Sequence, residues 1–419
     1  MVYFNPIECV LFPIIGGILI SISSSLNLYL KGRITGISGI LYNLWFQEDK
    51  DNNYWRWSFI YSLLTCSMIL AIIDLKYFYE TQDIFVKDLS TIGYCLSGLL
   101  VGFGTKLANG CTSGHGVCGL PRFSKRSMVA VACFFLSAIA LATFRHYVPF
   151  LDEKDIVIKA HLEVKNNYII IDYIYRGSFL GVMSGCYIIY IIIIICFRIK
   201  KNKNENLIAC SNNNNTDRSI FKPKKDFFIS DILLALLTGG LFGIGLVFSG
   251  MVKRNKVTNF LTMYSNWDPS LLFIFGTVVA INIITFNLII KKVKFPKYCS
   301  KELSLPNNKI DLKLVFGSII FGLGWGLGGM CPGPAIIDGM LFIPILVCFY
   351  VLFIVGQYFA QLLNKCTETT NKLNKINSIK VLNNNEELQN KNKNNNNNNK
   401  ENLDIIDSPY LDLNERIKK

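Results

Sequence analysis

The hydrophobic positions of this sequence gather into long runs that are separated by short polar segments. Nine of these runs approach the length of about 20 mostly apolar residues that a membrane-spanning helix needs. They cover residues 9–30, 57–75, 91–109, 127–145, 178–197, 230–250, 270–290, 312–330 and 342–364. The pattern therefore predicts an all-α polytopic membrane protein with about nine transmembrane helices.

The composition agrees with this interpretation and excludes several other classes of protein. Of the 419 residues, 51% are hydrophobic and 17% are charged, whereas a soluble domain carries about 25% charged residues. This excludes a soluble enzyme, a disordered chain and a disulfide-rich secreted scaffold. The net charge of +14 does not indicate nucleic-acid binding, because most basic residues lie in the short segments between apolar runs, where such residues set topology.

The basic residues on alternate sides of the runs predict an orientation. Outside the C-terminal tail, 22 Lys and Arg fall on the side that carries Arg33 and Arg122, against 10 on the other side. The richer side is expected to face the cytosol. The N-terminus is then expected outside and the C-terminus in the cytosol, in a plasma membrane rather than an organelle membrane.

Two sequence blocks recur in the same order in both halves of the chain. Gly17 corresponds to Gly240 at an offset of 223, and the block Gly102–Cys111 corresponds to Gly322–Cys331 at an offset of 220. Because one odd helix, 178–197, separates the halves, the second half is expected to run opposite to the first. This is the inverted-repeat plan of many transporters, and coincidental glycine-rich packing helices are the alternative.

These features divide the chain into five parts. Residues 1–145 form the expected first membrane repeat and residues 230–364 the second, with 146–198 as an external loop and connecting helix. Residues 199–229 form a polar cytosolic linker. Residues 365–419 form an Asn-rich tail that is too polar to bury a core and is expected to be disordered.

Each repeat contains one stretch in which glycine and proline gather beside a cysteine. The first reads GCTSGHGVCGLP over residues 110–121, and the second reads GGMCPGPA over residues 328–335. This density of Gly and Pro predicts broken helices or re-entrant loops, which persist at membrane depth where they line an enclosed cavity. Cys111 and Cys331 are therefore expected to approach the midplane from opposite faces. A thiol is a weak donor that suits a soft sulphur-bearing solute.

The residues themselves leave other interpretations open. Cys111, His115 and Cys118 supply three ligands for zinc or copper, whereas structural zinc takes four, so no metal or other cofactor is expected. The loops can also be surface turns with inert cysteines, and no Cys-x-x-Cys redox pair occurs in the sequence. His115 is a functional candidate as an ionisable group in a membrane fold, or a turn residue bonded to backbone.

Two of these motifs resemble the YeeE/YedE sulphur-transport family, whose best-understood members are bacterial thiosulfate transporters. They are GFGTKLANGCTSGHG at Gly102–Gly116 and GLGWGLGGMCPGP at Gly322–Pro334. Shorter blocks at Gly32–Gly39, Phe248–Met251 and Trp267–Ser270 extend the resemblance over about residues 9–364.

The resemblance implies an hourglass-shaped, all-helical protein with two pseudo-symmetric halves. It implies that thiosulfate passes along by hydrogen bonds to cysteine thiols, and the matching thiols here are Cys111 and Cys331. Thiosulfate-transporting relatives have a third cysteine in the first-repeat loop. The corresponding loop here, Gly32–Ser38, has none, and Thr35 and Ser38 are the hydroxyl donors available in its place.

The sequence thus predicts transmembrane uptake of a small sulphur-containing anion, thiosulfate first, through a cysteine-lined constriction. No Gly-x₄-Gly-Lys-Ser/Thr phosphate loop occurs, so a passive or ion-coupled transporter is expected rather than an enzyme. Its expected partners are the anion, the bilayer and a cytosolic sulphur-acceptor protein. The alternative is a membrane sulphur-relay protein that carries a persulfide on Cys111 or Cys118. The residues expected to contact the anion are Gly110, Cys111, Thr112, Ser113, Gly114, His115, Cys331, Pro332 and Gly333.

Overall fold

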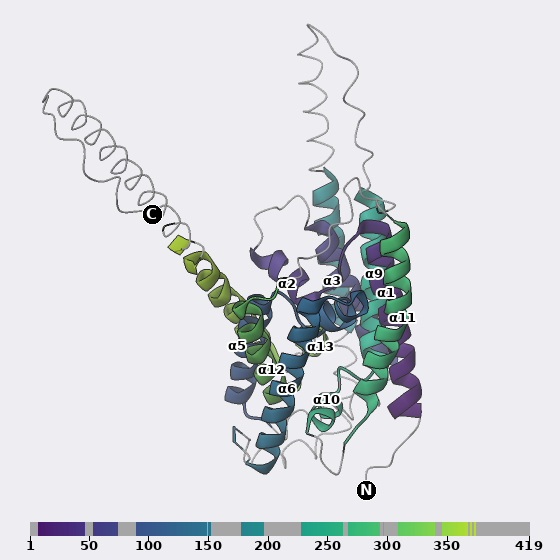
Figure 1. The fold of residues 1–419 in the computed structure, drawn as a ribbon. Helices are drawn as coiled ribbons and strands as arrows, with labels where there is room; N and C mark the ends of the chain where they lie inside the picture. Colours follow the sequence, from purple (N-terminus) through teal and green to yellow (C-terminus); the bar gives the residue numbers. More distant parts are fainter. Residues whose placement is uncertain are drawn as a thin grey trace, which may run out of the picture. The chain divides into compact units, whose positions relative to one another are not determined.

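The structure, a computed structural model, describes the chain in separate stretches. They are residues 7–46, 53–73, 89–148, 150–151, 177–196, 228–262, 267–293, 296, 309–339, 346–367, 369–370 and 373. Every regular element in these stretches is a helix (Figure 1). Most of the expected external loop, linker 199–229 and tail 365–419 lie outside the described residues, so the predictions about these segments stay predictions.

No strand occurs in the part of the chain that the structure describes. In chain order they are η1 (Ile7–Leu11), α1 (Phe12–Lys31), α2 (Ile37–Phe46), α3 (Tyr54–Ile73), α5 (Thr91–Ala108), η3 (Thr112–Val117), η4 (Leu120–Arg122), α6 (Lys125–Tyr147), α9 (Phe228–Phe248), α10 (Arg254–Leu261), α11 (Ser270–Lys292), α12 (Leu312–Gly328) and α13 (Pro332–Gly339). The helices Gly177–Cys196 and Leu346–Thr367 complete the described set.

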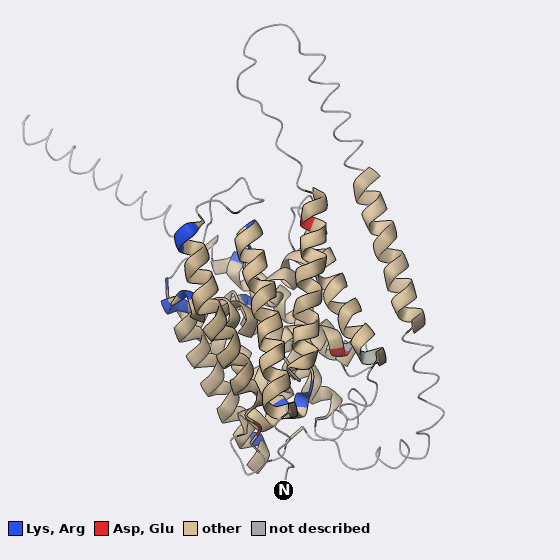
Figure 2. Cartoon of the chain, turned by 90° about the vertical axis from the view of Figure 1, so that its right-hand side faces the viewer, with Lys and Arg blue, Asp and Glu red and all other residues tan. Residues whose placement is uncertain are grey.

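Eight helices among the described residues are long and apolar enough to cross a membrane. They are Cys9–Lys31, Thr91–Val117, Lys125–Tyr147, Gly177–Cys196, Phe228–Phe248, Ser270–Lys292, Leu312–Asp338 and Leu346–Thr367. The remaining expected run, 57–75, which is not among these eight helices, corresponds to α3, a helix of 20 residues. The prediction of an all-α polytopic membrane protein is confirmed. In Figure 2, Lys and Arg gather near helix ends and leave the helix middles almost uncharged.

The two helices that lead to the cysteines begin and end in the same way. The side chains of Ser90 and Asp311 accept hydrogen bonds from the first turns of α5 and α12, which is a favourable N-cap. Both helices end on a left-handed residue, Asn109 with φ 58° and Gly329 with φ 66°. These two residues lie at the repeat offset of 220, so the local geometry of both breaks is the same.

The long helices pack in two groups within residues 1–361, one unit of the chain (Figure 1). In one group α1 packs on α9 and α11, and α3 packs on α9. In the other, α12 packs on both α5 and α6. The short helices bridge the groups, because η3 contacts both α6 and α11, and α2 contacts both α3 and α5. Both cysteines precede short helices of this bridging layer.

Two matched glycines allow close packing across the two halves. A Cβ atom on Gly102 of α5 would overlap the backbone of Phe353, and one on Gly322 of α12 would overlap the backbone of Phe134. Each glycine thus packs against a helix from the other half of the sequence. Small residues of this kind let membrane helices approach closely.

The helices also follow the order that two matched repeats require. Helices α1, α5 and η3 correspond by sequence to α9, α12 and α13, and the matched pairs α1–α9 and α5–α12 pack against each other. The inverted orientation of the repeats, their boundaries and the side on which each terminus lies stay predictions.

Candidate functional site

Each cysteine lies directly between a broken membrane helix and a new short helix. After α5 ends, Cys111 has an extended backbone with φ −129° and ψ −166°, and η3 starts at Thr112. After α12 ends, Cys331 is followed at once by α13, which starts at Pro332. The expected breaks occur, and a short helix begins after each cysteine. Proline at the first helical position is compatible with a helix, because the amide it lacks has no intrahelical partner there.

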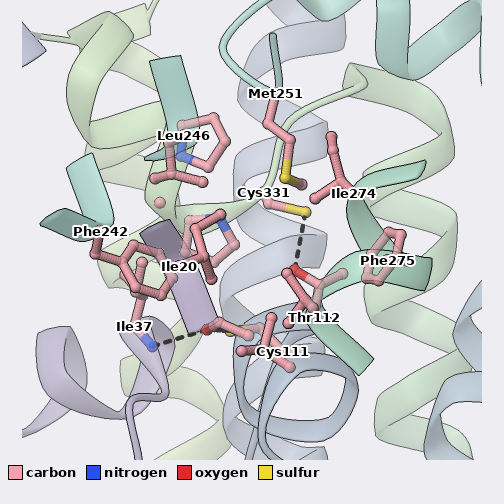
Figure 3. Close-up of a pocket in the computed structure, with 16 residues that line it drawn as sticks. Ile20, Ile37, Cys111, Thr112, Phe242, Leu246, Met251, Ile274, Phe275 and Cys331 are labelled. Atoms are coloured by element: carbon pink, nitrogen blue, oxygen red, sulfur yellow. Dashed lines mark hydrogen bonds between the residues drawn. The ribbon is translucent and has the colours of Figure 1, made fainter. Parts of the chain in front are cut away.

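The two cysteine stretches meet at a small cavity, here called the inner cavity (Figure 3). It has a volume of about 30 Å³, which is room for one or two water molecules. Its walls are mostly apolar. The residues that line it are Ile20, Ile37, Cys111, Thr112, Ser113, Val117, Phe242, Leu246, Met251, Ile274, Phe275, Val278, Cys331, Pro332, Gly333 and Pro334.

Each of the two thiols has a hydroxyl partner in this cavity. The Thr112 hydroxyl donates to the sulphur of Cys331 at 3.4 Å, and the sulphur of Cys111 lies 3.1 Å from the Ser113 hydroxyl oxygen. That oxygen also accepts from the backbone amide of Ile37 at 3.0 Å. Cys111 is 1% exposed and Cys331 is 4% exposed. The inner cavity therefore presents neutral donors from both halves of the chain and no charged side chain.

A second cavity, here called the arginine vestibule, adjoins the Cys111 loop. Its volume is about 300 Å³. The loop residues Gly110, Gly114 and His115 line it, whereas Cys111, Thr112 and Ser113 line the inner cavity. The same short loop thus contributes to both cavities. The other residues that line the vestibule are Arg33, Ile34, Gly36, Ser38, Gly39, Ile40, Asn43, Trp55, Arg56, Asn109, Arg122, Ser124, Arg126 and Ser127.

One buried acidic side chain, Asp231, balances part of the charge around the vestibule. Arg33 pairs with Asp231 at 3.1 Å, and Lys31 pairs with the same carboxylate. The Tyr54 hydroxyl donates to Asp231 at 2.9 Å. These contacts join the loop after α1 to the first turn of α9. A carboxylate removed from water is stabilised by such paired cations and donors.

Two further arginines come from the segment that follows the Cys111 loop. Arg126 pairs with Asp311 at 3.3 Å. Arg122 donates through Nε to the Cys118 carbonyl at 2.6 Å, and no carboxylate in the described part of the chain forms an ion pair with it. Burial lowers the pKa of the Arg122 guanidinium from its ordinary value, although a guanidinium stays charged at neutral pH.

The ring of His115 ties the Cys111 loop to its surroundings. Its Nδ1 lies 3.1 Å from the Ser127 hydroxyl and its Nε2 lies 3.4 Å from the Ala108 carbonyl. The Cys118 thiol is directed elsewhere and donates to the Thr35 carbonyl at 3.7 Å. Among the described residues no three His, Cys, Asp or Glu side chains gather as a metal site. The geometry matches the turn-residue interpretation of His115.

The structure divides the nine expected site residues between the two cavities. Six line the inner cavity and three line the vestibule. The proposed substitutes for a third thiol do not reach the inner cavity. Thr35 accepts a hydrogen bond from Asn27 at 3.1 Å, and Ser38 lines the vestibule.

The sequence reasoning missed two groups of residues. The apolar wall of the inner cavity comes from distant helices, for example Ile20, Phe242 and Ile274, and no local signal identifies these positions. The vestibule residues Arg122 and Arg126 entered the charge count as topology anchors. The structure shows that four arginines and no lysine line this cavity.

Comparison with known proteins matches the two halves of the chain to two different families. A family described as sulphur transport matches residues 7–140, and a family of unknown function, DUF6691, matches residues 230–372. Each matched range contains one of the two cavity cysteines.

Similar proteins occur in Xylella fastidiosa, where they bear the name "Probable transporter". One from strain 9a5c is 46% identical over 105 residues, which is 25% of this chain and 70% of the relative. One from strain Temecula1 / ATCC 700964 is 40% identical over 133 residues, which is 32% of this chain and 93% of the relative. These relatives are therefore much shorter than this chain.

Proposed function

This chain belongs to the YeeE/YedE-like sulphur-transport family, and we propose that it carries a small sulphur-containing anion, thiosulfate first, through the inner cavity. The observation that carries the proposal is the meeting of Cys111 and Cys331 in one cavity. They come from matched loops of the two halves, and the Thr112 hydroxyl contacts the Cys331 sulphur at 3.4 Å. Both thiols therefore line one and the same cavity.

The donors of the inner cavity suit the passage of an anion better than its retention. Thiols and hydroxyls replace part of the hydration shell that the anion loses in a narrow space. A fixed cation at this depth would hold the anion strongly, because water no longer screens the attraction. Conduction requires binding that is favourable enough for the solute to enter and weak enough for it to leave. The neutral thiols Cys111 and Cys331 meet that requirement.

Purified full-length protein in liposomes provides the direct test. Uptake of radiolabelled thiosulfate without any partner protein is expected, with stronger competition from selenosulfate than from sulfate. Selenosulfate keeps a soft terminal atom for the thiols, whereas sulfate has none. Absent uptake, or equal competition by the two anions, would contradict transport through a thiol constriction.

A persulfide relay is the second candidate, and the burial of the thiols argues against it. Cys111 is 1% exposed and Cys118 is 0% exposed, so a sulphur-acceptor protein reaches neither thiol unless the loop opens. The same liposome preparation separates the two functions. Labelled sulphur that remains on cysteine after the free anion is removed would favour the relay, and label released inside the vesicle would favour transport.

We also infer that the vestibule side faces the cytosol, because it carries the basic residues that set topology. Single cysteines introduced into the 199–229 linker of a cysteine-depleted variant test this orientation. Labelling by an impermeant reagent is expected only after the cells are opened. Labelling of intact cells would reverse the orientation and the order in which a solute meets the two cavities.

A further inference from the structure

The arginine vestibule has the composition of an anion site that works without thiols. Four guanidinium groups line it, from Arg33, Arg56, Arg122 and Arg126, and none of its lining residues in the described chain is acidic or a cysteine. Its volume of about 300 Å³ is large enough for a hydrated tetrahedral anion. The chemistry of this space therefore differs from that of the inner cavity beside it.

Among the described residues, the ion pairs around the vestibule do not include Arg122. Asp231 is shared by Lys31 and Arg33, so one carboxylate faces two cations. Arg122 uses its Nε for the Cys118 carbonyl, and no other hydrogen bond or ion pair among the described residues uses its two Nη groups. These groups remain available to a ligand in the cavity.

Topology anchoring does not explain this arrangement by itself. Lysines on the same expected face, Lys125, Lys291 and Lys292, are exposed and do not line the vestibule. An anchor needs only a positive charge near the membrane surface, which lysine supplies equally well. The cavity instead collects arginine, whose planar fork binds oxyanions through two parallel hydrogen bonds.

Trp55 holds two of these arginines in place at the cavity wall. Its ring lies 4.3 Å from the guanidinium of Arg33 and 5.1 Å from that of Arg56. Stacking of this kind orients a guanidinium while leaving its edge free to donate. The fluorescence of the Trp55 indole is therefore expected to change when an anion binds beside it.

We propose that the arginine vestibule is a second anion site, which binds doubly charged tetrahedral oxyanions on the cytosolic side of the two thiols. Guanidinium groups recognise oxygen atoms and charge, so the site accepts sulfate and thiosulfate alike. Selection for sulphur takes place at the inner cavity, on the other side of the loop that lines both spaces. The inference rests on the proposed function only for this second step.

Binding to purified full-length protein in detergent, at low ionic strength, tests the site directly. Sulfate and thiosulfate are titrated by calorimetry and by tryptophan fluorescence. Comparable affinities are expected for the two anions. Arg122→Gln is expected to weaken both by about tenfold, whereas Lys125→Gln, which removes an exposed charge from the same segment, is expected to leave both unchanged. Trp55→Phe is expected to remove the fluorescence response to both anions.

A second set of variants keeps the test valid if Arg122→Gln does not fold. It also separates this proposal from the proposed function. Arg56→Gln is expected to weaken sulfate binding even if Arg122→Gln is not recovered as a monodisperse protein. Cys331→Ala is expected to keep sulfate binding and lose uptake. Sulfate binding that survives both arginine changes, or that disappears with Cys331→Ala, would overturn the vestibule site. Binding without thiosulfate uptake in the wild type would instead overturn the proposed function and leave the vestibule site standing.

Discussion

The same short loop lines both the inner cavity and the arginine vestibule, but the two cavities differ in volume, charge and polarity. One has a volume of about 30 Å³, apolar walls and two buried thiols. The other has a volume of about 300 Å³ and four arginines. Charge is thus concentrated where the space is wide and is absent where it is narrow.

This difference indicates how the protein can attract an anion without retaining it. In a wide and hydrated space an ionic attraction is weakened by water, so an arginine site releases what it binds. In a narrow apolar space the same arginine would hold the anion far more strongly. Neutral thiols and hydroxyls at Cys111, Thr112 and Cys331 provide weaker contacts there. Because the charged site and the narrow site are separate, the protein can attract an anion at one and let it pass through the other.

The largest effect is expected from removing the thiol of the second half. Cys331→Ala should abolish thiosulfate uptake, because the inner cavity loses one of its two thiols and the Thr112 hydroxyl loses its partner. The protein should still fold, since the lost hydrogen bond is worth about 0.5–1.5 kcal/mol. Liposome uptake together with size-exclusion chromatography checks both points. Normal uptake by a well-folded variant would remove the thiols from the mechanism.

A slightly smaller loss is expected at the matched position of the first half. Cys111→Ser should lose most of the uptake, because the hydroxyl is shorter and harder than a thiol and lies beside Ser113, which already supplies a hydroxyl. His115→Ala, measured beside it, should lose less, since His115 lines the vestibule and bonds Ser127 and the Ala108 carbonyl. Equal loss in both, together with inactivation by chelators, would favour a metal site instead.

Removing charge from the vestibule should change the concentration dependence of uptake and leave its maximum rate nearly intact. Arg122→Gln is expected to raise KM several-fold for thiosulfate supplied from the vestibule side, since one cation contributes about 1 kcal/mol to binding in a partly hydrated site. Raising the salt concentration should reduce the difference from the wild type. Initial rates over a range of thiosulfate concentrations check this. A lower maximum rate at unchanged KM would mean that Arg122 acts at the inner cavity.

The smallest effect is expected at the third buried cysteine of these loops. Cys118→Ser should retain most uptake, because the Cys118 thiol lines neither cavity and makes a 3.7 Å contact with the Thr35 carbonyl. The repeat offset of 220 takes it to Asp338, which is also buried and also absent from both cavities. Uptake reduced as strongly as in Cys111→Ser would show that lining the inner cavity is not the deciding property.

Much of this architecture is readable from local patterns. The apolar runs predict the helices because each membrane helix satisfies its own backbone hydrogen bonds over a fixed length. The Gly-rich blocks that end in Cys111 and Cys331 identify the two broken helices, since glycine density and the spacing of 220 are properties of neighbouring residues. The same patterns could not show that the chain resumes a helix after each cysteine, which depends on the packing around these loops.

Only the tertiary structure decided which residues line the same cavity. The Thr112 hydroxyl donates to the Cys331 sulphur, and Ile20, Phe242 and Ile274 complete the wall around them. The arginines of the vestibule come from the loop after α1, from α3 and from the segment after η3. Cavities of this kind form between elements that are far apart along the chain. Hydrophobicity and charge along the sequence therefore predict the helices and the broken loops, while the division of one cysteine loop between a charged vestibule and a neutral constriction arises from the packing of the two halves.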